Sequence, residues 1–259
     1  MFVLRPTTPQ LGEPGLVSAR GFEPPRPFGH RILSPARLPF RHADNTAKDS
    51  YEGKAGVRSR YDHVAVRNAL LVVDIQNDFV EGGALPVKGG MQVAAMVSRH
   101  LRHFKQEYNF VVATRDYHED PAGHFSDHPD FVNTWPPHCV IGTQGAALCP
   151  PIFNLVREKL ISTVVDKGRH APAYSGFEGL DPRGHPLLDV LREARVDHMD
   201  ICGLATDYCV RATALDARKH DFQVRVLVNL TAAVNEETGL QALEEMKAAG
   251  CMVQAATAP

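Results

Sequence analysis

The sequence lacks the features that define several protein classes. No apolar run approaches the ~20 residues needed to span a bilayer, and no continuous apolar segment near the start forms a secretory signal. A formal net charge of -2 at pH 7 argues against a nucleic-acid or membrane partner, since either favours a basic face. Glycine pairs occur, but the Lys-Ser/Thr ending of a phosphate-binding loop and the dinucleotide-binding fingerprint are both missing.

Cysteine is scarce and has no pattern of a disulfide framework. The chain holds five cysteines, an odd number without framework-like spacing, which fits a reducing compartment. We therefore expect a cytoplasmic protein. Four of the cysteines are predicted to be packing residues: Cys139, Cys149, Cys202 and Cys251.

Residues 1–60 differ in kind from the rest of the chain. They contain 8 of the 19 prolines, many arginines and no apolar periodicity. A transit peptide is one alternative for an Arg-rich segment, but five acidic residues and the weak amphipathic pattern count against it. The composition favours a disordered Pro/Arg-rich extension without chemistry, and an upstream start codon assigned in error would also produce one.

Residues 61–259 alternate between strand-like and helix-like patterns. Such alternation predicts parallel strands with crossover helices, and hence one three-layer α/β domain with a mostly parallel sheet of about six strands. The expected strands are 68–73, 110–114, 161–165, 198–202, 224–228 and 252–254. The expected helices include 91–106, 186–195, 207–220 and 236–249, with Gly250 placed to end the last one.

Four potential metal ligands follow the strand-like run 110–114. A carboxylate and three imidazoles brought together by one loop suit a borderline divalent cation such as zinc. The alternative is a polar loop with solvated rings, although Trp135, Pro136 and Pro137 stiffen the approach to the last of the four. The candidate ligands are Asp116, His118, His124 and His138.

Three other reactive side chains stand at or just after the ends of predicted strands. Ligands bind outside the carboxyl ends of strands in open parallel sheets, so Asp74, Lys167 and Cys209 are candidates for one crevice. Together they supply the parts of a cysteine hydrolase, in which Asp74 takes the thiol proton and Lys167 favours both negative charges. The backbone N–H groups around Ala205 and Cys209 could receive the oxyanion of a tetrahedral intermediate. Each residue alone has an ordinary structural explanation, but the three together at strand ends do not.

Five segments resemble the isochorismatase-like cysteine hydrolase family, and within it the nicotinamidases. They are LLVVDIQNDFVEGGALPVKGG, TRDYHEDPAGHFSDHP, TWPPHCVIGTQGAAL, DKGRHAPAYSGFEG and DICGLATDYCVRATALDA, in the family's order, and the resemblance runs from about Asn68 to the C-terminus. It implies the isochorismatase-like hydrolase fold, the same triad and metal ligands, and a cis Leu204–Ala205 bond. It also implies a pocket for a pyridine ring lined by Phe79, Trp135, Tyr174, Leu204 and Ala205.

The activity implied by this resemblance is hydrolysis of nicotinamide, and by extension pyrazinamide, with one divalent metal ion. Zinc is the first expectation for the metal, with iron or manganese as alternatives. Two other functions stay open: an amidohydrolase of the same family acting on a ureido or carbamoyl compound, and a catalytically silent α/β binding protein. The complete metal set favours a pyridine substrate over the first alternative, and the complete triad argues against the second. A homo-oligomer is compatible with the sequence, which does not identify the oligomeric state.

Overall fold

A computed structural model describes residues 67–258. The expectation of a disordered extension over residues 1–60 lies outside the described residues. Within the described part of the chain, no helix is long and apolar enough to cross a membrane.

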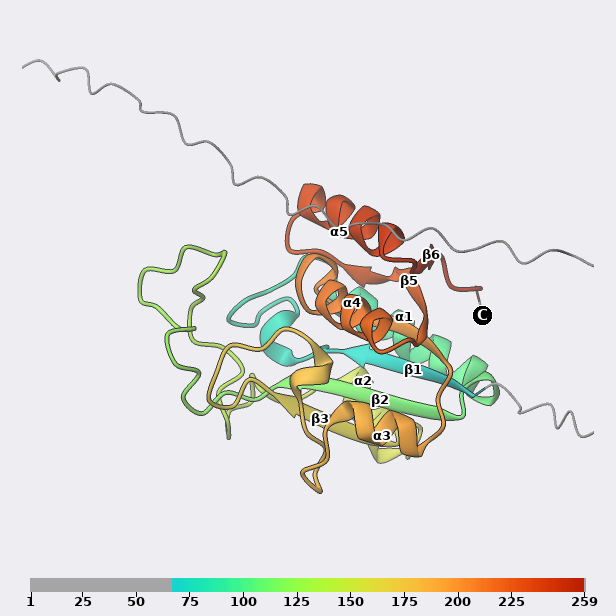
Figure 1. Ribbon diagram of the computed structural model, residues 1–259. Coiled ribbons are helices and arrows are strands. Elements are labelled where there is room, and N and C mark those ends of the chain that lie inside the picture. The colour runs from blue at the N-terminus through green and yellow to red at the C-terminus, as the bar shows by residue number, and fades with distance from the viewer. Residues whose placement is uncertain (1–66, 259) are drawn as a thin grey trace, which may run out of the picture. The chain divides into compact units, whose positions relative to one another are not determined.

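Six parallel strands form a single sheet in the order β3-β2-β1-β4-β5-β6 (Figure 1). This confirms the predicted parallel α/β architecture. The strands are β1 (Asn68–Val73), β2 (Phe110–Asp116), β3 (Thr163–Lys167), β4 (His198–Leu204), β5 (Gln223–Ala232) and β6 (Met252–Gln254). The order reverses between β1 and β4, and this switch point is where open α/β sheets bind ligands at the strands' carboxyl ends.

Helices cover both faces of the sheet and complete three layers (Figure 1). Along β1, Leu70 and Val72 pack on the face covered by α1 (Gly90–Phe104) and α2 (Pro150–Arg157). Ala69 and Leu71 belong to the opposite core, which contains α3 (Leu187–Glu193), α4 (Arg211–Lys219) and α5 (Glu236–Ala248). Because β1 is buried on both faces, its apolar run is continuous instead of alternating. The shorter helical turns are η1 (Asn77–Phe79), η2 (Lys105–Glu107), η3 (Gly176–Glu178) and η4 (Thr206–Val210).

Most predicted elements lie within a few residues of the observed ones, with two informative differences. The strand expected at 161–165 is β3, Thr163–Lys167, because the amide of Ile161 bonds to Leu155 O and completes the end of α2. Lys167 is therefore the last residue of a strand. Helix α2, whose eight residues begin with two prolines, was not predicted. Gly250, in the left-handed region at φ 87°, follows α5 as expected.

Candidate active site

The predicted reactive side chains come together at the carboxyl edge of the sheet. Asp74 follows β1, Asp116 ends β2 and Lys167 ends β3, while Cys209 lies in the turn η4 after β4. The four strands are consecutive neighbours in the sheet. Parallel pairing therefore converts residues far apart in the sequence into one cluster.

Lys167 is the centre of this cluster. Its Nζ lies 3.0 Å from Asp74 Oδ2 and 3.6 Å from Cys209 Sγ, and it donates to Ala173 O at 3.1 Å. It also forms a short contact with Asp116 Oδ1. The side chain of Lys167 is completely buried, as is that of Asp74. A single ammonium group thus contacts two carboxylates and the thiol.

Burial controls the protonation of the three predicted catalytic groups. It raises the pKa of Asp74, against the attraction of Lys167, and so makes this carboxylate a stronger base. Burial also raises the pKa of the Cys209 thiol well above its usual value, although Lys167 opposes the shift. Burial would lower the pKa of Lys167, but Asp116 and Asp74 outweigh it and keep the group charged. As a nucleophile, the Cys209 thiol would therefore need a base, and Asp74 is a nearby carboxylate whose pKa is raised.

The turn that carries Cys209 combines an expected backbone feature with a carboxylate whose role the sequence did not reveal. The Leu204–Ala205 peptide bond is cis, as the family resemblance implies. The buried carboxylate of Asp207 accepts bonds from the amides of Val234 and Asn235 at 3.0 and 3.1 Å, and from Thr238 Oγ1 at 2.6 Å. Asp207 therefore ties the turn to the start of α5.

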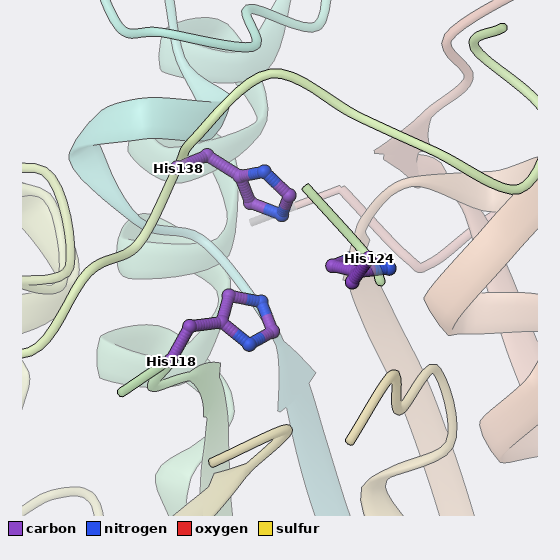
Figure 2. A group of neighbouring side chains, drawn as sticks. All are labelled: His118, His124 and His138. Carbon is purple, nitrogen blue, oxygen red and sulfur yellow. The ribbon is translucent and has the colours of Figure 1, made fainter. Parts of the chain in front are cut away.

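The imidazoles of His118, His124 and His138 face a common space (Figure 2). Nitrogens of His118, His124 and His138 lie within 4.8 Å of one another, and all three residues are buried. Asp116 Oδ2 faces the same space, 3.7 Å from His118 Nε2 and 3.9 Å from His138 Nε2. The structure thus brings all four predicted ligands together.

The hydrogen bonds of these rings leave nitrogen lone pairs for a ligand. His118 Nδ1 lies 2.5 Å from Gly168 O, and His138 Nδ1 lies 2.8 Å from Pro136 O. A carbonyl only accepts, so both Nδ1 atoms carry the proton and both Nε2 atoms are unprotonated in the neutral rings. A Cβ at Gly168 would lie 2.5 Å from the His118 ring, so glycine permits this close approach.

The side chains of His118, His124 and His138, together called the imidazole group, have the chemistry of a metal site. Among residues 67–258, His118 Nε2 and His124 Nδ1 are buried side-chain nitrogens without a hydrogen-bond partner. Burial lowers the pKa of His124 to about 4 and also lowers that of His138, so both rings are neutral at pH 7. Neutral imidazoles with a carboxylate suit a divalent transition metal.

One pocket is lined by Cys209 together with two of the imidazoles, His124 and His138. All five predicted pocket residues line it, and Trp135 Nε1 donates to Tyr174 OH at 3.1 Å. Sequence reasoning missed Tyr208, whose ring lies 5.1 Å from that of Trp135 and 5.9 Å from that of Tyr174. The signal available in the sequence was the position of Tyr208 directly before Cys209 in the segment DICGLATDYCVRATALDA. The other unpredicted apolar lining residues are Leu85, Val87 and Val234.

A larger hollow lies at the opposite, amino-terminal edge of the strands and contains none of these groups. Its buried carboxylate, Asp200, already pairs with Arg225 and accepts from Tyr108 OH at 2.8 Å. These bonds satisfy the carboxylate. Among residues 67–258, the candidate reactive side chains therefore lie at the carboxyl edge of the sheet.

The fold and the site define an α/β protein with the side chains of a cysteine hydrolase. Residues 68–258 match the model of the Isochorismatase domain, and the chain belongs to the isochorismatase family. The nicotinamidase/pyrazinamidase of Mycobacterium tuberculosis is 50% identical over 181 residues, which cover 70% of this chain and 95% of the relative.

Solved structures agree with the family assignment. The pyrazinamidase of Pyrococcus horikoshii in complex with zinc has a TM-score of 0.61 and 39% identity, covering 73% of this chain and 99% of the other. The yeast nicotinamidase bound to the inhibitor nicotinaldehyde has a TM-score of 0.64 and 28% identity, covering 73% and 100%.

Proposed function

We propose that this protein is a nicotinamidase that hydrolyses nicotinamide to nicotinate and ammonia, a step of NAD salvage, and that it also accepts pyrazinamide. The observation that carries the proposal is one apolar pocket lined by Cys209 and by the imidazoles of His124 and His138. The 50% identity to a nicotinamidase/pyrazinamidase supports the same substrate class.

In the first half of the reaction, Asp74 removes the proton of Cys209 and the thiolate attacks the carboxamide carbon. The C–S bond forms as the carbonyl electrons move to oxygen, and the backbone amides of Ala205 and Cys209 are proposed to stabilise that oxyanion. When the intermediate collapses, the C–N bond breaks. Asp74 returns the proton to the leaving nitrogen, and ammonia departs from a thioester on Cys209.

In the second half, water hydrolyses the thioester. Asp74 accepts a proton from the water as its oxygen attacks the carbonyl carbon, and collapse of this intermediate breaks the C–S bond. The proton on Asp74 returns to the Cys209 sulfur, and the nicotinic acid formed gives up its carboxyl proton to solvent and leaves as nicotinate. Lys167 lies 3.0 Å from Asp74 and 3.6 Å from Cys209 and positions both groups. Its positive charge stabilises the negative charge that moves between them.

Asp116, His118, His124 and His138 are proposed to hold one divalent metal ion. Zinc fits this donor set first, with iron or manganese as alternatives. When bound, the metal would supply a Lewis acid for the ring nitrogen of nicotinamide, directly or through water, and so orient the carboxamide toward Cys209. The rings of Phe79, Trp135 and Tyr174, with Leu204 and Ala205, form the walls around the pyridine.

The five cysteines are all buried free thiols, which supports the proposed reducing, cytoplasmic compartment.

The decisive experiment measures ammonia release from nicotinamide, pyrazinamide and ureidoacrylate by the purified protein. We expect turnover of the first two amides and little of the third. Rapid acid quench during nicotinamide turnover should trap a nicotinoyl thioester on Cys209, detectable by mass spectrometry. Preferred hydrolysis of ureidoacrylate would overturn the substrate assignment, and turnover by the Cys209→Ala variant would overturn the covalent mechanism.

A further inference from the structure

Gln76 is a buried amide that the mechanism does not use. It lies two residues after Asp74, and its exposure is 0%. The side-chain Nε2 donates to Asp116 O at 2.7 Å and to Ala146 O at 3.0 Å. The side-chain Oε1 accepts from Asp116 N at 2.7 Å. Both backbone polar groups of Asp116 are therefore bonded to this one side chain.

These two hydrogen bonds to Asp116 extend the pairing of β1 with β2 beyond the point where the main-chain pairing ends. The pairing of β1 with β2 ends at Val72 opposite Ala113, and the amide of Asp74 still bonds to Thr114 O at 3.2 Å. Two residues further along, the carboxamide of Gln76 offers the same donor and acceptor as a peptide group. It thereby continues the ladder to Asp116 from a side chain.

The main chain of Gln76 is fixed on its other side. It forms an antiparallel bridge with Leu148, in the segment that follows His138. The neighbouring amides of Asn77 and Cys149 bond to Ala147 O at 2.9 Å and to Ile75 O at 3.0 Å. The position of Gln76 is thus set by the main chain, so its side chain can act as a fixed clamp.

We propose that Gln76 is a positioning residue that aims the Asp116 carboxylate at the imidazole group and so determines the affinity of the metal site. The inference rests on the proposed function, because it assumes that Asp116 and the three histidines bind a metal. Two bonds to one residue restrict its backbone rotation and hence the direction of its Cα–Cβ bond. Residues that orient metal ligands typically change metal affinity by about 10–100-fold when they are replaced.

The test compares Zn²⁺ affinity, measured by chelator competition on protein stripped with EDTA, in wild type and in Gln76→Leu. Leucine removes all three bonds at similar volume, and we expect Kd to rise about 10–100-fold. Gln76→Glu is the second variant, because it can accept from Asp116 N but turns a carboxylate toward two carbonyl oxygens. It should also bind Zn²⁺ more weakly, and the absorption spectrum of bound Co²⁺ should change in both variants.

Asn229 provides a control with the same pattern of hydrogen bonds at an exposed position. Its side chain also clamps one backbone from both sides, accepting from Ala256 N at 2.6 Å and donating to Ala256 O at 3.4 Å. Asn229→Leu should leave the Zn²⁺ Kd within about twofold of wild type, because Ala256 is not among the proposed metal ligands.

The outcomes separate the inference from the function on which it rests. Tight Zn²⁺ binding by wild type with equal binding by both Gln76 variants would overturn the role of Gln76 and leave the metal site standing. An equal loss of Zn²⁺ affinity in Asn229→Leu would also overturn the role of Gln76, since the loss would then reflect general destabilisation of the fold. Absence of stoichiometric metal binding by wild type would overturn the proposed site and the inference together.

Discussion

Replacing Lys167 with methionine should destabilise the protein far more than any surface charge change. Methionine keeps most of the side-chain stem and removes the ammonium group. Lys167 is buried against two carboxylates, Asp74 at 3.0 Å and Asp116 in a shorter contact. Neither carboxylate can reach water in place of the lost partner, since the Asp74 side chain is 0% exposed and that of Asp116 is 5% exposed.

The expected magnitude follows from this geometry. Breaking a buried ion pair by removing one partner costs about 3–5 kcal/mol. Two carboxylates lose their partner here, so the metal-free variant should lose about 5 kcal/mol, or between three and four powers of ten in the unfolding equilibrium. With Zn²⁺ bound beside Asp116, one carboxylate keeps a positive neighbour, and the loss should fall towards about 3 kcal/mol.

Urea unfolding followed by circular dichroism, with EDTA and with Zn²⁺, measures both values. If Lys167→Met is unfolded in EDTA even without urea, that result agrees with the larger expected loss of about 5 kcal/mol. Lys219→Met is the control, because Lys219 pairs with Asp216 at 2.7 Å but its side chain is 73% exposed. It should change stability by less than about 1 kcal/mol. A loss below 1 kcal/mol for Lys167→Met in EDTA would refute the claim that this ammonium neutralises the buried carboxylates.

Three further predictions address the nucleophile, the metal ligands and the first residues of the chain. Cys209→Ala should abolish ammonia release while metal content and the circular dichroism spectrum stay nearly unchanged; a matching loss of metal would show a structural role instead. His118→Ala should lose metal and most nicotinamide turnover, yet iodoacetamide should still label Cys209, because the thiol depends on Asp74 and Lys167. Benzamide, which has no ring nitrogen, should lose much less, and equal losses for the two amides would contradict an orienting metal. Deleting residues 1–60 should leave kcat and Tm nearly unchanged, since the family match begins at residue 68; a large fall in Tm would contradict the proposed domain boundary.

The parallel sheet was predictable because its central strands carry the strongest local signal. The run 68–73 is buried on both faces, so it is uniformly apolar and its limits agree with those of β1. Helix α5 is likewise bounded by local chemistry, with Asn235 capping its start and Gly250 following its end. Helix α2 was missed because its burial depends on the contact of Ile152 and Leu155 with a distant core.

The reactive residues of the candidate site were predictable, whereas their supports were not. Asp74 and Cys209 stand next to strand patterns, and three histidines within a short stretch are conspicuous in any sequence. Gln76 and Asp207 act through hydrogen bonds to residues 40 and about 30 positions away, and no local pattern encodes such distances. Their roles depend on tertiary geometry alone.

The central place of β1 has a consequence for how the protein is made. During synthesis β1, β2 and the following loop leave the ribosome well before β4 and Cys209, so all four proposed metal ligands, Asp116 at the end of β2 and the three histidines of the loop, are made first. The edge of β1 that pairs with β4 therefore stays unpaired until His198 has been made and can pair with Asn68. Such an edge is exposed to pairing with other chains in a partly folded state. Docking of β4 closes that edge and delivers the thiol in the same event, so an incomplete chain could collect metal before it could hydrolyse an amide.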